Sequence, residues 1–424
     1  MISFASLFVG LVYGIVTVQL LAAGPVDRVD LLLDGLKVAE LRAPFSAPLD
    51  LGCEPAPHEL VAVAFDSRGA ELARARQWVN RPRPQAEATL VLEPGSGERG
   101  RTARLTWRSL AGEVPRAIAV TFDDRPLPAP DPSRIEVPPH DPAQVHVLRA
   151  SLDFGGDVRA TAEAYVGGSA RDEAVTELTA VAVEVETGRE LPPPEGLAGW
   201  LEKDGVPLEA AAVEEGPAEL VFVAEGSVLE RLRKTFRFRT VPLASGLPPD
   251  LGYRFLWPVG AMTAQSAMVS NVYPVTRRLS RADGAVSWVA DRRLVWPAWS
   301  RKGQRIADAV AVAALVAAEG ERRRAVVLLL GPEAEDGSLL TPAEATAFLG
   351  SLNVPLQVWS IGARPSPEAA RWPAGKTVTS ARQFEAAVAS LLEGVVRQRV
   401  VWVEGGHLPQ SILPSATAPL RLAR

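Results

Sequence analysis

The hydrophobic period of this chain changes near residue 219, and this change constrains the fold more than any other feature. Before it, short runs alternate between apolar and polar residues and are separated by Pro, Gly and Asp. A period of two is typical of strands that bury one face. After it, apolar runs such as "RAVVLLLG" alternate with helical stretches such as "GQRIADAVAVAALVAAEG". The sequence therefore predicts an all-β amino-terminal half and a carboxyl-terminal parallel sheet covered by helices.

Length, charge and cysteine content limit the number of domains, the kind of partner and the kinds of metal site that this chain can have. The 424 residues exceed what one hydrophobic core organises. A formal net charge of -5, with no basic block longer than Arg322-Arg323-Arg324, argues against nucleic acid as a partner. Cys53 is the single cysteine, which excludes an intrachain disulfide, a thiolate zinc site and an iron–sulfur cluster. The abundance of Ala, Pro and Arg indicates a bacterial, high-GC coding bias.

The first 23 residues are almost entirely apolar. They end in the small pair Ala22-Ala23, before a polar "PVDRVD". This pattern predicts a secretory signal peptide cleaved after Ala23. Because the run is long enough to cross a bilayer, a membrane anchor at residues 1–23 is the second possibility, and a buried core helix is the third. We therefore expect an exported protein, located in the periplasm, on the cell surface or in the medium.

Two immunoglobulin-like β-sandwich modules are predicted next, at residues 24–95 and 96–172. Their strand patterns recur in the same order, since "VDLLLDGLKV" aligns with "IAVTFDDRPL" and "PHELVAVAFDSRGAELARA" aligns with "VHVLRASLDFGGDVRATAE". The linker between the modules is expected at "LEPGSGERGRTA".

The repeat places two histidines and two leucines at matching positions. His58 and His146 each open a strand, and Leu60 and Leu148 are expected to be equivalent buried residues. We interpret the histidines as strand-edge residues of two separate domains rather than as a pair of metal ligands.

The remaining residues are predicted to form a β segment at 173–218 and an α/β domain with a carboxyl-terminal tail at 219–424. Helices are expected to begin at Thr341, where Glu344 completes a capping box, and at Ser380. "RVVWVEGG" is expected to close the sheet. The alternation of strands and helices indicates a three-layer, doubly wound α/β/α domain.

The order of these segments resembles the von Willebrand factor type A domain, in the branch found in exported bacterial proteins. "LVFVAEGS" stands where that family has a strand running into Asp-x-Ser-x-Ser, and "GQRIADAV" is similar to its "GTxLxDAL". "RRRAVVLLLGPEAEDG" is similar to its "ALVLLTDGxD", and "VPLQVWSIG" to its "VxVYxIG". The resemblance covers residues 219–405. It implies three loops that meet at the carboxyl edge of the sheet, where family members hold a divalent cation with oxygen ligands.

Carried over position by position, the resemblance implies that the metal site has been lost. Ala224, Gly226 and Val228 stand at the Asp and the two Ser of the first loop. Gln304 replaces the Thr of the second loop, and Gly331 replaces the Asp of the third. Ala, Gly and Val offer no side-chain oxygen, so we expect neither a metal nor a cofactor here.

A substitute cation site is the alternative. A shift of the first motif by one residue places Glu225 and Ser227 at acidic and hydroxyl positions. The third loop adds three acidic residues, Glu333, Glu335 and Asp336. Such a shift requires a compensating bulge, and acidic residues in a surface loop are usually solvated. Asp308 matches the Asp of "DAL", which the family does not use as a direct ligand.

Catalysis has little support in the sequence. The four histidines are His58, His140, His146 and His407, and no nucleophile elbow, phosphate loop or zinc-protease motif is present. Asp123 and Asp124 are adjacent, so on a strand they would face opposite ways. We therefore predict a non-catalytic interaction or scaffold protein with an unidentified protein partner. The alternatives are a cation-dependent adhesin that uses Glu225 and Glu333, and a structural subunit of an envelope assembly.

Overall fold

A computed structural model describes most of the chain as two compact units. The described residues are 2–6, 8, 11–22, 24–81, 86–93, 102–109, 114–123, 125–128, 131–140, 146–155, 158–166, 178–185, 191–214, 218–228, 251–259, 273, 275, 279–280, 303–319 and 323–424. The larger unit consists of residues 1–82 and 178–424, and the smaller unit of residues 83–177.

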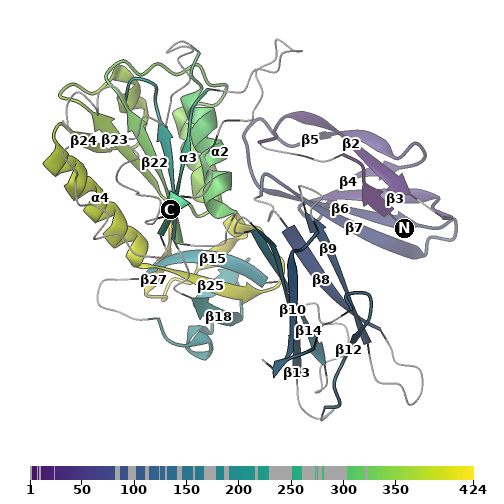
Figure 1. The fold of residues 1–424 in the computed structure, drawn as a ribbon. Coiled ribbons are helices and arrows are strands. Elements are labelled where there is room, and N and C mark those ends of the chain that lie inside the picture. The colour runs from purple at the N-terminus through teal and green to yellow at the C-terminus, as the bar shows by residue number, and fades with distance from the viewer. Residues whose placement is uncertain are drawn as a thin grey trace. The chain divides into compact units, whose positions relative to one another are not determined.

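An immunoglobulin-like β-sandwich begins the larger unit (Figure 1). One sheet has the order β1-β2-β5 and the other β4-β3-β6-β7. Their bounds are β1 Ile2–Phe4, β2 Ile15–Ala22, β3 Arg28–Leu33, β4 Leu36–Leu41, β5 Ser46–Asp50, β6 His58–Phe65 and β7 Glu71–Val79. Along β2 the inward residues Val18 and Leu20 are buried, whereas Thr17 and Gln19 are exposed. This alternation is expected of a strand that packs one face on a core.

The domain boundary predicted at residue 23 is wrong, because the segment expected to be a leader builds part of this sandwich. β1 pairs with β2, with Ile2 opposite Ala22, and β2 pairs with β5, with Val18 opposite Ala47. The alternation of β2 is hard to detect in the sequence because its outward face also carries large apolar residues, Ile15 and Leu21. In the parts of the chain that the structure describes, no helix is long and apolar enough to cross a membrane.

The smaller unit repeats the first sandwich strand for strand. Its sheets have the orders β8-β9-β12 and β11-β10-β13-β14, which match β1-β2-β5 and β4-β3-β6-β7. The bounds are β8 Ala86–Glu93, β9 Thr102–Ser109, β10 Ala117–Phe122, β11 Arg125–Pro126, β12 Ile135–Glu136, β13 His146–Gly155 and β14 Val158–Val166. As the repeated pattern predicts, Leu60 and Leu148 are equivalent: both are fully buried, opposite Leu33 and Phe122 respectively.

The predicted boundary between the two modules also moves. β8 and β9 are paired antiparallel, with Glu93 opposite Thr102. The Gly-rich segment "LEPGSGERGRTA" therefore joins two strands of one module instead of linking two modules. Its central residues, 94–101, lie outside the described residues.

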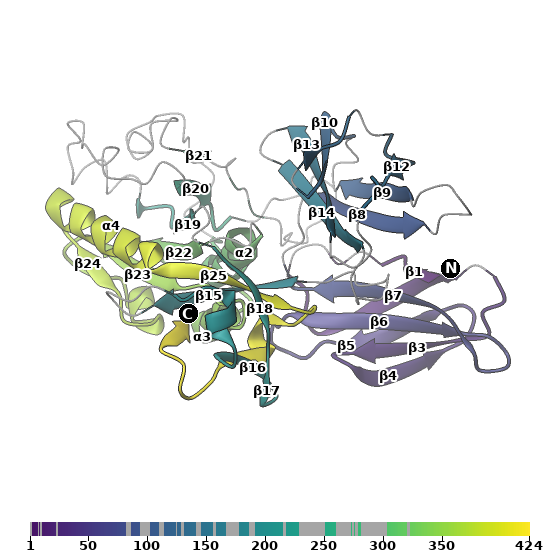
Figure 2. The ribbon, with the colours of Figure 1, turned by 90° about the horizontal axis from the view of Figure 1, so that it is seen from below.

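A third β-sandwich is formed by segments far apart in the sequence (Figure 2). Its sheets have the orders β18-β25-β15-β27 and β17-β16-β26. The bounds are β15 Leu178–Val185, η1 Pro194–Leu197, β16 Leu201–Lys203, β17 Val206–Pro207, β18 Ala210–Glu214, β25 Gln398–Glu404, η5 Pro409–Ser411, β26 Ile412–Pro414 and β27 Leu420–Leu422. The α/β domain is therefore an insertion between β18 and β25.

Two predictions fail because of this insertion. "RVVWVEGG" forms most of β25, which pairs antiparallel with β15 and β18 and not with the parallel sheet. Residues 173–218 and 219–424 consequently do not form consecutive domains. A short apolar run specifies a buried strand but not the sheet that it joins.

The inserted α/β domain has a six-stranded sheet of order β21-β20-β19-β22-β23-β24, which is parallel except for β21. The bounds are β19 Ala218–Ala224, β20 Leu251–Leu256, β21 Leu279–Ser280, α2 Ile306–Ala318, β22 Arg323–Leu330, α3 Pro342–Ser351, β23 Leu356–Ile361, η4 Pro367–Arg371, β24 Lys376–Val378 and α4 Ala381–Val396. The sequence also predicts a helix at "SVLERLRKTFR", which lies outside the described residues after Val228.

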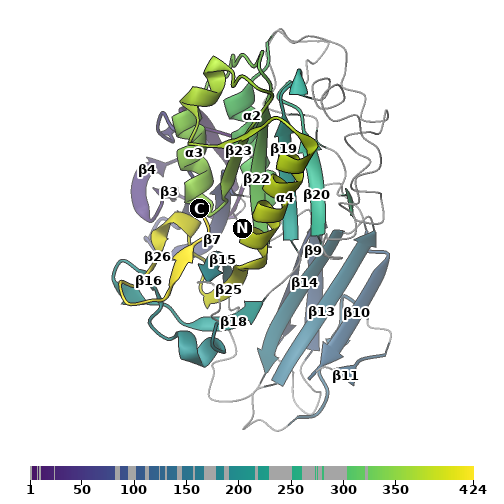
Figure 3. The ribbon, with the colours of Figure 1, turned by 90° about the vertical axis from the view of Figure 1, so that its left-hand side faces the viewer.

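Helices cover both faces of this sheet (Figure 3), and each face has its own apolar core. On β19, Val221 and Val223 pack with α2 and α3, whereas Leu220 and Phe222 pack with α4. Two helix starts are confirmed. The capping box at Thr341 is complete, and the Ser380 side chain accepts a hydrogen bond from the backbone N–H of Gln383.

Candidate functional site

The predicted ligand positions gather at the carboxyl ends of β19 and β22. These strands are neighbours, whereas β20 lies on the other side of β19. Strands added before β22 therefore extend the sheet on one side of β19, and strands from β22 onward extend it on the other side. Ligands in open α/β sheets bind outside the strand ends at such a switch point. Glu225 to Ser227 follow β19, Gly331 follows β22, and Gln304 precedes α2.

The centre of this edge is the carboxylate of Glu225, which is 1% exposed. Its Oε1 accepts hydrogen bonds from the backbone N–H of Ser227 (2.8 Å) and from Gln304 Nε2 (3.0 Å). Its Oε2 accepts from Ser227 Oγ (2.5 Å) and from the backbone N–H of Gly331 (3.2 Å). Gln304 Oε1 in turn accepts from the backbone N–H of Gly226 at 2.8 Å. The three loops are thereby joined through one buried carboxylate.

This network has the chemistry of an anion site, with the anion supplied by the protein. The groups that point at Glu225 are N–H and O–H donors, which stabilise a negative charge. A hard cation needs several oxygen ligands directed at one point. The Glu225 oxygens are directed at donors instead, so cation binding would require at least part of this network to break.

Gly331 allows the third loop to approach Glu225 closely. A Cβ atom at this position would lie 2.1 Å from Ser227 Oγ and 2.8 Å from Glu225 Oε2. The Asp that the resemblance places here is therefore incompatible with this packing. The resemblance places Gly331 at a ligand position of that family, but its role in packing was not predicted from the sequence.

The other two replaced positions contribute to the core. Ala224 and Val228 are buried with the residues that pack against α4. The structure therefore brings together Gly226, Gln304 and Gly331, and directs Ala224 and Val228 away into apolar packing.

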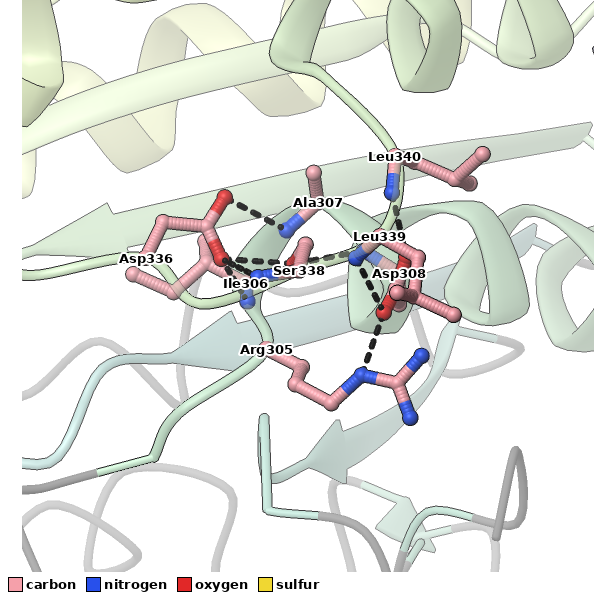
Figure 4. Close-up of polar contacts among 8 residues, drawn as sticks. All are labelled: Arg305, Ile306, Ala307, Asp308, Asp336, Ser338, Leu339 and Leu340. Carbon is pink, nitrogen blue, oxygen red and sulfur yellow. Dashed lines mark hydrogen bonds and ion pairs between the residues drawn. The ribbon is translucent and has the colours of Figure 1, made fainter. Parts of the chain in front are cut away.

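Asp336 of the third loop caps helix α2 (Figure 4). Its Oδ1 accepts from the backbone N–H of Ile306 at 2.7 Å, and its Oδ2 accepts from that of Ala307 at 3.3 Å. Ser338 donates to the same Oδ1 through its backbone N–H (2.9 Å) and its Oγ (2.6 Å). A carboxylate at a helix N-terminus satisfies backbone donors that lack intrahelical partners. This acidic residue is therefore a structural cap.

Asp308 ties the same loop to the first turn of α2. Its carboxylate accepts from the backbone N–H groups of Leu339 (3.1 Å) and Leu340 (3.0 Å) and pairs with Arg305. Burial raises the pKa of the nearby Tyr273, and the negative charge of Asp308 raises it further.

The residues proposed as substitute ligands are not assembled around one point. Glu333 and Glu335 are exposed, Asp336 caps α2, and Glu225 is bound by protein donors. Among the described residues there is no group of three or more His, Cys, Asp or Glu side chains that could hold a metal ion.

We expect Asp336→Ala to lower the free energy of unfolding by about 1–2 kcal/mol, the range typical of a lost helix cap. Glu335→Ala is the matched control, since that side chain is exposed in the same loop, and it should change stability by less than about 0.5 kcal/mol. Urea unfolding monitored by circular dichroism measures both. Equal effects would contradict the role of Asp336 as a cap.

The two histidines at the repeat position belong to different units. His58 Nδ1 lies 2.7 Å from Asp34 Oδ2, which connects the start of β6 to the β3–β4 turn. His146 begins β13 of the other unit, and its side chain lies outside what the structure describes.

No family model matches the sequence, and no curated protein matches it. Solved structures that match part of this chain include the fibronectin(III)-like modules of CbhA from Clostridium thermocellum, at 24% identity over 19% of this chain and 93% of that chain (TM-score 0.17). Another is proximal thread matrix protein 1 from the mussel byssus, with a zinc-occupied MIDAS motif, at 16% identity over 46% of this chain and 49% of that chain (TM-score 0.27). The central fibronectin-III array of RIM-binding protein is 11% identical over 48% and 81% (TM-score 0.20).

Proposed function

We propose that this chain is a non-catalytic interaction or scaffold protein whose inserted domain is a three-layer, von Willebrand factor type A-like domain that has lost its metal site. The Glu225 network carries this proposal. At the edge where the resembled family holds a cation, a buried carboxylate is bound by four donors from the protein itself. A partner would then bind through protein surface and not through a bridging metal.

The architecture supports the scaffold part of this proposal. Three β-sandwiches accompany the α/β domain, and both chain connections of that domain run to paired strands, β18 and β25. Such an insertion connects the α/β domain to the third sandwich through both of its ends. A bacterial source is proposed from composition and from the resemblance, and export from the resemblance, since residues 2–4 and 15–22 form two strands of a sandwich.

The adhesin alternative is less compatible with the described contacts. It requires Glu225 to exchange protein donors for a cation and Glu333 to turn inward from an exposed position. The first change would break the hydrogen bond that joins the third loop to the first.

Thermal melting of the full chain tests the loss of the metal site. We expect the same melting temperature in millimolar Mg²⁺, in Mn²⁺ and in chelator. A ligand present at a hundred times its dissociation constant would add ~2.7 kcal/mol, which is readily detected. A rise in melting temperature with metal that disappears in Glu225→Ala or Glu333→Ala would overturn the proposal.

Glu225→Gln gives a complementary measurement. Its amide NH₂ would face a donor, either Gln304 Nε2 or the N–H of Gly331, so we expect a loss of about 1–2 kcal/mol that is equal with and without metal. For the interaction role, a pull-down with the tagged full chain should capture the same protein partner in Mg²⁺ and in chelator. Capture that requires the metal would favour the adhesin.

A further inference from the structure

The connection between β1 and β2 of the first sandwich reaches the α/β domain within the larger unit. Leu11 is 4% exposed and belongs to the apolar core that lies between the parallel sheet and helices α2 and α3. Tyr13 packs against the same core, whereas Val12 packs against the core of its own sandwich. Successive side chains thus serve two different domains, as the alternation of an extended segment allows.

Asn80 fixes this segment from the sandwich side. It is buried beyond the end of β7, with a φ of 54°. Its Oδ1 accepts from the backbone N–H of Val12 at 2.7 Å, and its Nδ2 donates to the carbonyl oxygens of Val12 (2.5 Å) and Ala56 (2.8 Å). Leu11 and Tyr13 are therefore held on a preformed support, which lowers the entropy lost on docking.

The docked residues share an apolar core with the loop that follows β22. Leu340 of the third loop belongs to the same apolar core as Leu11. Burial raises the pKa of Tyr13, and the charge of Asp308, which binds that loop, raises it further. A further hydrogen bond joins the first and third sandwiches, since Gln410 Nε2 donates to the carbonyl oxygen of Pro57 at 2.8 Å.

We propose that Leu11 and Tyr13 form a latch that holds the first sandwich on the α/β domain and can release without unfolding either. Among the described contacts, the side chains of Leu11 and Tyr13 pack on the α/β core and Gln410 of the third sandwich adds a hydrogen bond, whereas each domain has its own extensive core. Because Leu11 shares a core with Leu340, any partner that shifts the third loop changes the strength of the latch. By reciprocity, the position of the first sandwich then alters binding at that loop.

Distance measurements between two spin labels test this in the full chain. Cys53 is the single cysteine and is exposed on the first sandwich, so it takes one label. Ser390→Cys on the exposed face of α4 takes the other. The parent protein should give one narrow distance distribution. Leu11→Ala should add a broad component by raising the released population about tenfold to a hundredfold.

Leu21→Ala is the matched control, because Leu21 lies in the same sandwich and is 64% exposed. It should leave the distribution narrow. Urea unfolding of both variants verifies that the domains remain folded, and Tyr13→Ser provides a second latch variant should Leu11→Ala fail to fold. A broad distribution in the parent protein, or a narrow one in a folded latch variant, would overturn the proposal.

Discussion

Val18→Asp should unfold the first β-sandwich, whereas Thr17→Asp, one residue earlier on β2, should leave it folded. Val18 is 0% exposed between the two sheets, and Thr17 faces outward. An unpaired carboxylate in that core would be desolvated without a donor, at a cost of more than about 3 kcal/mol. The same carboxylate at residue 17 remains in water. Both substitutions introduce the same charge, at adjacent positions. A difference in stability between the two variants therefore requires that residues 17 and 18 face opposite sides of β2.

Limited proteolysis and urea unfolding of the full chain measure this difference. With Val18→Asp, cleavage should appear within residues 2–81 while the α/β domain stays resistant. Thr17→Asp should match the parent protein. Equal behaviour of the two variants would mean that residues 15–22 do not form β2 in the folded protein, and would restore the interpretation of residues 1–23 as a leader.

Local signals in the sequence predicted local structure well. The helix starts at Thr341 and Ser380 depend on side chains within three residues of the cap, so the pattern alone identifies them. The strand order of the repeated sandwiches was also implied by the sequence, because the same alternation recurs around Leu60 and Leu148.

Pairing between distant segments was not predictable in the same way. β25 has the apolar pattern of a buried parallel strand, yet it pairs with β15 and β18, from which the whole inserted domain separates it in the sequence. No residue of "RVVWVEGG" specifies that partner. β2 was missed for a different reason, since exposed Ile15 and Leu21 hide its period of two.

The candidate site was located from the sequence, but its chemistry was not. The resemblance placed Gln304 and Gly331 at one edge of the sheet, and the structure brings both to Glu225. Sequence reasoning treated Glu225 as a possible cation ligand, because spacing does not show which donors surround a carboxylate. The donors from Gly331 and Ser227 are a backbone N–H and a short hydroxyl, whose approach depends on the path of two loops.

Gly331→Ala should lower the free energy of unfolding of the α/β domain by about 2–3 kcal/mol, because a single methyl group overfills the junction of the first and third loops. Its Cβ would lie 2.1 Å from Ser227 Oγ and 2.8 Å from Glu225 Oε2, so these side chains or the loop must shift, which weakens the hydrogen bonds of Ser227 and Gly331 to Glu225. Gly350→Ala in α3 is the control with the opposite sign. Beyond its chain neighbours and its own helix backbone, no described atom lies within 4 Å of the added Cβ, and Ala in a helix should stabilise by about 0.5–1 kcal/mol. Urea unfolding compares the two, and a stabilising effect of both would contradict the close packing of the third loop on Glu225.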